Sequence, residues 1–256
     1  MSWSTALRAY ATKKDPSTLP STVLFSHTSS TITIFDAYPK AIFHFLILPR
    51  PSQRLSVLDL ANLRSLIRKD NELALVVVKE LQAEAVKLKG EIHVEMLERY
   101  GFTWPIHCGF HAVPSMEHLH LHVISADLTS PSLKNKKHYN SFKPGHGFFL
   151  PIEDVLGWFE GSHEHLTSMS ALNRNQYEVL LKEDLSCHLC DRSFKNMPQL
   201  KSHLQEEWDA LRQRGARKRR KSPDESEQDA PDAQPAAKKR AISRESSIEA
   251  ELQIQK

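Results

Sequence analysis

Along this chain, short apolar runs typical of strands alternate with stretches in which apolar residues recur every three to four positions. The strand-like runs are residues 22–25, 31–35 and 42–48, with two more near residues 106–113 and 119–125. The helical stretches are residues 3–11, residues 57–89 with a break near Asp70 and Asn71, and most of residues 151–182. The chain is therefore expected to contain both strands and helices.

The last part of the chain lacks any such apolar period. After about Arg212, segments such as RGARKRRKSP and DESEQDAPDAQPAAKKR predict a disordered tail. Residues 211–256 hold 12 Lys/Arg and 8 Asp/Glu, a net charge of +4, whereas the other 210 residues carry a net charge of −1. The expected folded body is therefore not basic overall, and nucleic acid would have to bind to local basic patches.

Cysteine usage and apolar run length narrow the class of protein. The chain has 256 residues and only 3 cysteines, at positions 108, 187 and 190, too few for a disulfide framework. The N-terminal MSWSTALRAY has no long apolar core, and the longest apolar stretches, such as residues 73–78, are far shorter than a membrane span. We therefore expect a soluble intracellular protein with no membrane partner.

The sharpest motif is a run of three alternating histidines, His118, His120 and His122, separated by leucines and followed by Val123. On a strand, alternation places the three imidazoles on one face and the apolar residues on the other. A neutral imidazole can attack phosphorus, and neighbouring histidines can bind phosphate oxygens and move protons, with His111 just upstream. Metal binding, or no specific role, are the alternatives for such a triplet.

A second motif lies near the end of the predicted folded part. Cys187 and Cys190 are followed by His203, with Phe194 and Leu200 at the core positions of a Cys2His2-type zinc finger. No histidine follows His203, so Glu207, one helical turn later, is the expected fourth ligand, and Glu206 and His188 are weaker candidates. Four protein ligands predict a structural zinc ion whose binding supplies folding energy.

The sequence around the histidines resembles a known family. The strings are DAYPKAIFHFLILPR at 36–50, GFHAVPSMEHLHLHVIS at 109–125 and SPSLKNKKHYNSF at 130–142. They resemble the aprataxin family of the histidine-triad superfamily, and KSHLQEEWD resembles its fungal members, which place a glutamate at the fourth zinc ligand. The resemblance covers roughly residues 3–210. It implies an α+β fold, in which a histidine-triad domain with an antiparallel sheet and packed helices is followed by a single C2HE-type finger.

The resemblance also implies a reaction and a set of roles. The middle histidine, His120, attacks the AMP phosphorus of an adenylated DNA 5′ end, and water then frees AMP and regenerates the enzyme. His111 matches the acid/base partner, and His118 and His122 match positions that flank the phosphate. The substrate-binding positions implied by the resemblance are Asp36 for the ribose, Ser115 and Lys137 for phosphate, His44 in the pocket and Trp3 as an aromatic wedge on the terminal base pair.

Several of these residues also have plainer interpretations. Asp36 can be a turn residue, Ser115 can cap a turn, and Lys137 can belong to a solvated cluster with Lys134 and Lys136. Trp3 can pack in the core. The finger could read base sequence, but we favour a clamp on the DNA backbone. The residues expected to contact phosphate are Arg192, Lys195 and Lys201.

The predicted domain order is a wedge helix, a catalytic domain, a helical connector, the finger and a basic tail. Their bounds are 1–20, 21–150, 151–182, 183–212 and 213–256. RKRRK at 217–221 and KKR at 238–240 resemble a bipartite nuclear localisation signal, so we expect a nuclear protein, with a cytoplasmic pool left open.

The expected function is hydrolysis of AMP from adenylated nicked or double-stranded DNA ends in single-strand break repair, with guanylated ends left open as substrates. A general hydrolase of nucleoside phosphoramidates or dinucleoside polyphosphates, and a non-enzymatic DNA-binding protein, are the two rival hypotheses.

Overall fold

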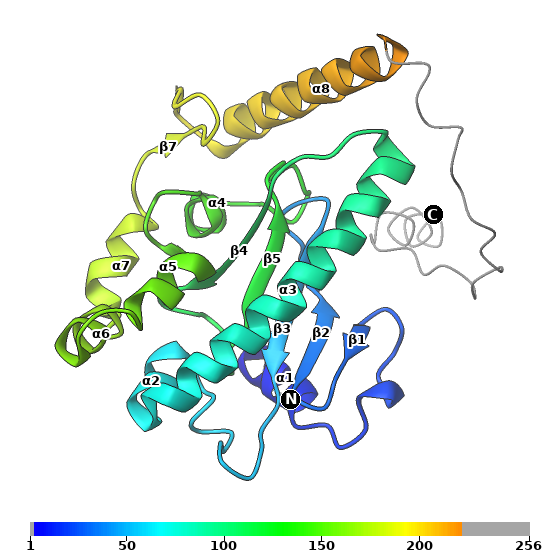
Figure 1. Ribbon diagram of the computed structural model, residues 1–256. Coiled ribbons are helices and arrows are strands. Elements are labelled where there is room, and N and C mark those ends of the chain that lie inside the picture. The colour runs from blue at the N-terminus through cyan, green and yellow to red at the C-terminus, as the bar shows by residue number, and fades with distance from the viewer. Residues whose placement is uncertain (1–2, 222–256) are drawn as a thin grey trace, which may run out of the picture.

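A computed structural model describes residues 3–221, and its centre is an antiparallel sheet (Figure 1). Within this range the sheet has six strands in the order β1-β2-β3-β5-β4-β6. The strands are β1 (Leu24–His27), β2 (Thr31–Phe35), β3 (His44–Pro49), β4 (Ile106–His111), β5 (Leu121–Ser125) and β6 (Phe149–Pro151). The α+β fold expected from the sequence is therefore confirmed.

One face of the sheet is covered by the long helix α3 (Asn71–Tyr100), which crosses in front of the strands in Figure 1. The helix begins where the Asp70 side chain accepts a hydrogen bond from the Leu73 N–H, and it ends at Gly101, whose φ of 77° favours glycine. Asp70 also ends the preceding helix α2 (Leu63–Lys69), so the predicted break is present. Alternate strand residues such as Phe45 and Val123 pack in the core under α3.

The opposite face carries the N-terminal helix. A 3-10 turn, η1 (Trp3–Thr5), leads into α1 (Ala6–Ala11), which packs against β2 and β3 on the side away from α3 (Figure 1). A second 3-10 turn, η2 (Pro16–Thr18), follows. The Ser4 carbonyl accepts a hydrogen bond from the Glu117 N–H at 2.8 Å. This bond joins η1 to the loop before the histidine triad.

The C-terminal half contains three short helices followed by a small finger. The connector contains α5 (Ile152–Trp158), α6 (His163–Met169) and α7 (Arg174–Leu180). The finger consists of β7 (Leu185–Ser186), β8 (Ser193–Phe194) and α8 (Met197–Lys221). Between the sheet and the finger lies α4 (Lys136–Phe142).

Helix α8 corrects the predicted start of the disordered tail, because it continues to Lys221 instead of ending near residue 212. Arg, Lys and Ala are good helix formers, and α8 packs through Trp208 against the end of α3. Gly215 lies so close to Phe102 that a Cβ would approach the Phe102 ring to 2.7 Å. A lack of apolar period therefore did not mean a lack of structure here.

Two other sequence predictions fall partly or wholly outside what the structure describes. The KKR segment at 238–240 and the rest of the tail from residue 222 lie outside the described residues, as does the Trp3 side chain. The nuclear signal and the aromatic wedge therefore stay predictions. Over the described part of the chain, none of the helices has the length and apolar character needed to cross a membrane.

Candidate active site and zinc finger

The histidine triad is not one continuous strand, which corrects the sequence prediction. Strand β5 begins only at Leu121, so of the three histidines His122 alone lies on the sheet. His118 has a φ of 86°, and its N–H bonds to the Ala61 carbonyl at 3.1 Å. The chain before β5 is therefore bent by contacts with the loop before α2, which no alternation rule could reveal.

His118 supports the site from behind instead of lining it. Its side chain is buried, and its Nε2 lies 2.7 Å from the Pro49 carbonyl oxygen, so Nε2 carries the proton. Burial lowers the pKa of His118 to about 4, which keeps the ring neutral. His118 is absent from the lining of the pocket that holds the other histidines.

His120 has a defined tautomer. Its Nδ1 lies 2.8 Å from the His118 carbonyl oxygen, which accepts only hydrogen bonds, so Nδ1 carries the proton. The lone pair of the neutral ring is then on Nε2. Burial lowers the pKa of His120, which favours this neutral form. The imidazole lines the pocket and is therefore presented as a nucleophile.

His44 fixes the tautomer of His122 in the same way. The Lys40 backbone N–H donates to His44 Nδ1 at 3.1 Å, so His44 Nε2 carries the proton and donates to His122 Nδ1 at 3.0 Å. The proton of His122 must then be on Nε2. Burial lowers the pKa of His44 to about 4 and the pKa of His122 well below its usual value. His44 is thus brought to the site, behind His122.

His111 completes the cluster from the neighbouring strand β4. Its ring centroid is 4.4 Å from that of His122, and both rings pack against Phe142 of α4. The pKa of His111 is lowered well below its usual value, and burial is the largest cause. A hydrogen bond to the Ser141 backbone opposes that shift. The Nε2 atoms of His111 and His122 are buried without a hydrogen-bond partner among residues 3–221, so both can serve a ligand.

Gly109 is the close neighbour of this cluster on β4, directly opposite His122 on β5. A Cβ at Gly109 would lie 2.5 Å from both the Leu150 carbonyl oxygen and the Phe149 ring. Only glycine lets the Phe149 ring cover β4 at this point. Because Phe149 also packs within 6.4 Å of the His122 ring, this close approach helps to fix the imidazole cluster.

A cavity of about 400 Å³ opens on this face of the sheet. Its polar side contains His111, His120 and His122 together with Asp36 and Ser115. Its apolar side comes from α1 and the first strands, with Leu7, Tyr10, Val23, Ile34, Phe35 and Leu46. The volume lies within the range of about 300–1,000 Å³ that is typical of small-ligand sites.

The predicted phosphate contact Lys137 lies outside the cavity, and sequence reasoning missed another lysine, Lys40, that lines it. Lys137 is exposed at the start of α4 and does not line the cavity. Lys40 does line it, is 9% exposed and donates from Nζ to the Tyr38 carbonyl. Burial lowers the pKa of Lys40, and the carboxylate of Asp36 opposes that shift. Lys40 lies between Tyr38 and His44, in a segment whose sequence is typical of a surface loop. Only its position four residues before His44 could have indicated that it lies near the site.

The second predicted motif also comes together in space. The metal-binding atoms of Cys187, Cys190 and His203 lie within 4.8 Å of one another, and Glu207 Oε1 lies 3.5 Å from His203 Nε2. Two thiols, an imidazole and a carboxylate one helical turn away are donors that zinc accepts in a tetrahedral site. The residues present therefore fit the ion.

Other candidate ligands are less suitable. His188 is correctly ranked as weak, because its Nε2 is 2.9 Å from the Ala126 carbonyl and its Nδ1 is 3.3 Å from the Tyr139 hydroxyl. Asp36, His44 and His122 also lie within 4.8 Å of one another. However, His44 uses both ring nitrogens within the protein, so a metal there would have to break two hydrogen bonds.

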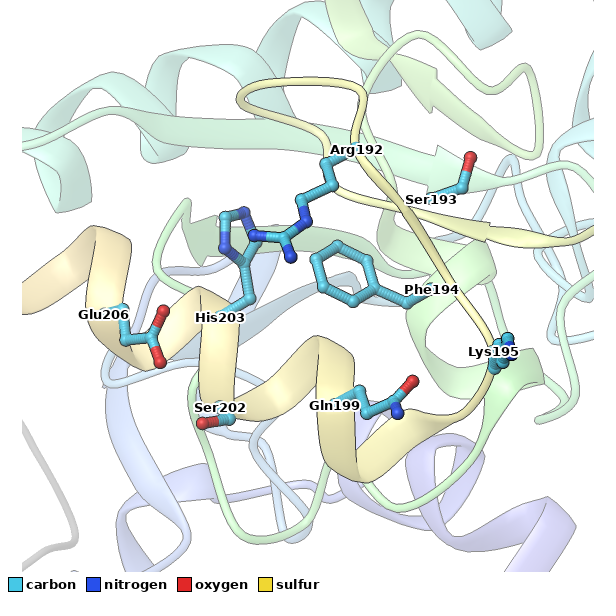
Figure 2. A pocket seen from close by; sticks show the side chains of 8 residues that line it. All are labelled: Arg192, Ser193, Phe194, Lys195, Gln199, Ser202, His203 and Glu206. Atoms are coloured by element: carbon cyan, nitrogen blue, oxygen red, sulfur yellow. The ribbon is translucent and has the colours of Figure 1, made fainter.

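The outer side of the finger carries a cleft of about 450 Å³ (Figure 2). Arg192 lies over the Phe194 ring, with its Cζ 5.4 Å from the ring centroid, and Lys195 lines the same cleft. Glu206 also lines it beside His203, as Figure 2 shows, whereas Lys201 does not line it. Two of the three basic residues predicted to contact phosphate thus share one hollow with an aromatic ring.

These features together define a histidine-triad protein with an attached zinc finger. The family described as "Scavenger mRNA decapping enzyme C-term binding" matches residues 5–138, and the family described as "C2HE / C2H2 / C2HC zinc-binding finger" matches residues 145–210. An aprataxin-like protein of Saccharomyces cerevisiae is 31% identical over 225 residues, which cover 82% of this chain and 98% of that protein. The chain therefore belongs to the aprataxin family.

Other relatives agree with this assignment. The aprataxin-like protein of Schizosaccharomyces pombe is 34% identical, over 70% of this chain and 71% of its own length. Chicken aprataxin is 38% identical, and the chain spans about half (48%) of it. A structure described as "Crystal structure of aprataxin ortholog Hnt3 in complex with DNA" has a TM-score of 0.59 at 28% identity and covers 84% of this chain and 100% of that one.

Proposed function

We propose that this protein is a DNA 5′-adenylate hydrolase, which removes AMP from abortive ligation intermediates during single-strand break repair. The observation that carries the proposal is the tautomer of His120, whose Nδ1 proton is held by the His118 carbonyl, so that the Nε2 lone pair serves the pocket. Membership of the aprataxin family and the likeness to a DNA-bound ortholog support a DNA end as the substrate.

In the first step, His120 Nε2 attacks the phosphorus of the AMP group. A P–N bond forms, the P–O bond to the DNA 5′-phosphate breaks, and that phosphate leaves with the electron pair. The Nε2–H of His122 donates to the phosphate oxygens, a role that its hydrogen bond to His44 prepares. His111, beside His122, is the acid/base partner for the leaving oxygen.

In the second step, water attacks the same phosphorus opposite the P–N bond. The bond's electron pair returns to His120 Nε2, and the proton lost by water passes to His111 or to the released phosphate. AMP then leaves. His120 is back in its starting tautomer, because its Nδ1 proton stays hydrogen-bonded to the His118 carbonyl throughout.

The cavity walls suit the two halves of AMP. The apolar side formed by Leu7, Ile34 and Leu46 takes the adenine ring, and Asp36 accepts hydrogen bonds from the ribose hydroxyls. Ser115 and Lys40 supply a hydroxyl and a buried cation at the phosphate end. Lys137, exposed on α4, is left to meet the DNA strand outside the cavity.

The finger holds the DNA backbone next to this cavity. Zinc, bound by Cys187, Cys190, His203 and Glu207, supplies the folding energy of the knuckle when present. Arg192 and Lys195 then face phosphates from the cleft in Figure 2. Nuclear import through the basic segments at 217–221 and 238–240 is part of the same proposal.

The test is His120→Ala, with His165→Ala on an exposed part of α6 as the matched control. His120→Ala should lower AMP release from nicked adenylated DNA by at least about a thousandfold, because the covalent route is lost, while DNA affinity stays within about twofold. Mass spectrometry of quenched wild-type protein should find AMP on His120. Undiminished turnover in His120→Ala would refute the proposal, and turnover of small dinucleotides far above that of DNA would favour the small-nucleotide rival.

A further inference from the structure

Helix α4 lies beside the finger in Figure 1 and shares an apolar cluster with it. Tyr139 of α4 contacts the cysteine knuckle directly. Tyr139 is fully buried. Its hydroxyl donates to the Ser186 carbonyl at 2.8 Å and accepts from the His188 N–H at 2.9 Å. These two backbone groups flank Cys187, so one hydroxyl is bonded to the main chain on both sides of the first predicted zinc ligand.

Further polar contacts fix the knuckle to the same part of the catalytic domain. Lys143, just after α4, donates to the Ser186 hydroxyl at 2.6 Å. His188 Nε2 lies 2.9 Å from the Ala126 carbonyl oxygen at the end of β5. Asn140 of α4 donates to the Glu183 carbonyl at 2.9 Å, just before β7. The knuckle is therefore joined to α4 and β5 by directional bonds as well as by apolar packing.

Phe142, the last residue of α4, touches the catalytic histidines. The Phe142 ring has its centroid 4.6 Å from that of His111 and 5.0 Å from those of His44 and His122. The Ser141 backbone accepts a hydrogen bond from His111. A short helix is stiff, so a displacement at Tyr139 is carried to Phe142 less than one turn away. The knuckle and the imidazoles thus contact the same short helix, through residues less than one turn apart.

We propose that Tyr139 is a positioning residue, through which the metal-loaded knuckle sets the placement of His111 and His122 for phosphoryl transfer. This inference rests on the proposed function for its kinetic consequence. The ion holds Cys187 in place, the flanking main-chain groups hold the Tyr139 hydroxyl, and α4 then holds the two imidazoles. The finger therefore has a second role besides gripping DNA, which is to keep the pocket in its reactive geometry.

The kinetic test uses Tyr139→Phe in the full chain, with Tyr177→Phe on α7 as the matched control. Tyr139→Phe keeps the buried ring and removes only the hydroxyl. We expect kcat for AMP release to fall about tenfold with KM within about twofold, because misplaced groups weaken the transition state and not the binding of AMP. Tyr177→Phe should match wild type in both constants. Unchanged kcat in a folded Tyr139→Phe protein would overturn the inference.

A second readout does not depend on turnover. In protein labelled with ¹⁵N-histidine, Tyr139→Phe and removal of zinc by a chelator should shift the same imidazole signals, those of His111 and His122, while Tyr177→Phe leaves them in place. Zinc release to a coloured chelator should also be faster in Tyr139→Phe. If neither change shifts the His111 and His122 imidazole signals, the coupling is refuted. If wild-type protein fails to turn over adenylated DNA but the signals still shift, the proposed function fails and the coupling stands.

Should Tyr139→Phe prove unfolded by circular dichroism, Lys143→Met takes its place. This variant breaks only the side-chain bond to the Ser186 hydroxyl, at a partly exposed position. It should shift the His111 and His122 signals in the same direction by a smaller amount. No shift in a folded Lys143→Met protein would then count against the inference.

Discussion

The imidazole pocket and the cysteine knuckle both contain histidine, but they are organised by different forces. At the pocket, His44, His118 and His120 each have a ring nitrogen bonded to a protein group, and a large apolar core lies under the sheet that carries them. In the knuckle, Cys187, Cys190 and His203 bring their donor atoms together beside a small core. Hydrogen bonds within the protein thus hold the histidines at the pocket, whereas we expect a bound metal ion to hold the donor atoms of the knuckle.

The largest effect is expected from a substitution that removes a predicted metal ligand from the knuckle. Cys190→Ser removes an exposed zinc ligand and should cost the finger its metal, and with it the metal-dependent part of its fold. We expect zinc content to fall from about one equivalent to almost none, and limited proteolysis to cut residues 183–221 while sparing the six-stranded sheet. A finger that resists protease without metal would show that its apolar core is sufficient and would contradict the comparison.

Acid should destabilise the pocket through its neutral histidines. Burial lowers the folded-state pKa of His44 and His118 to about 4, against 6.5 in the unfolded chain. Between these values the unfolded state binds more protons, so the stability is complete above pH 6.5 and is lost as the pH falls towards 4. From pH 7 to pH 5 we expect a loss on the order of 2 kcal/mol per histidine in urea unfolding. A flat stability over this range would contradict the buried neutral rings.

The hydrogen bonds that fix the tautomer of His122 can be tested at His44. His44→Leu removes the donor to His122 Nδ1, so the proton of His122 is no longer fixed on Nε2. We expect kcat to fall about tenfold, which is the scale of one misdirected hydrogen bond, with zinc content unchanged. His27→Leu, at an exposed position on β1, is the control. Nitrogen shifts of His122 that are the same in both variants would show that His44 does not set the tautomer.

The smallest effect is expected on the outer face of the finger. Arg192→Gln removes one cation from the cleft, so the slope of log Kd against log salt for nicked DNA should fall by about one. AMP release at saturating DNA should be unchanged. Arg174→Gln on α7 is the control, and an equal change in slope there would mean that the cleft in Figure 2 is not a phosphate contact.

Much of the fold could be predicted because periodicity reports local structure. The strand-like run at residues 31–35 coincides with β2, and Asp70 marks the predicted break as the cap of α3. The zinc ligands could be predicted because their spacing on one knuckle and one helix is local too. In each case the residues that define the feature are neighbours in sequence.

The remaining features depend on contacts between distant segments. His118 leaves the expected strand because its backbone pairs with Ala61, far earlier in the chain. Lys40 is buried where it lines the cavity, whereas Lys137 is exposed on the first turn of α4. Tyr139 lies within the segment SPSLKNKKHYNSF, next to a cluster of lysines, and nothing local marks it as a contact residue. Its hydrogen bond to Ser186 forms only when the finger packs against α4.

Gly109 has a consequence for any attempt to alter substrate range. A methyl group on this residue would lie only 2.5 Å from the Leu150 carbonyl and the Phe149 ring, so β4 tolerates no side chain at this position opposite His122. Leu7, Tyr10 and Val23, by contrast, line the cavity with side chains. New base selectivity would therefore have to be engineered from the N-terminal helix and first strand, where a change of side chain leaves the reacting groups untouched.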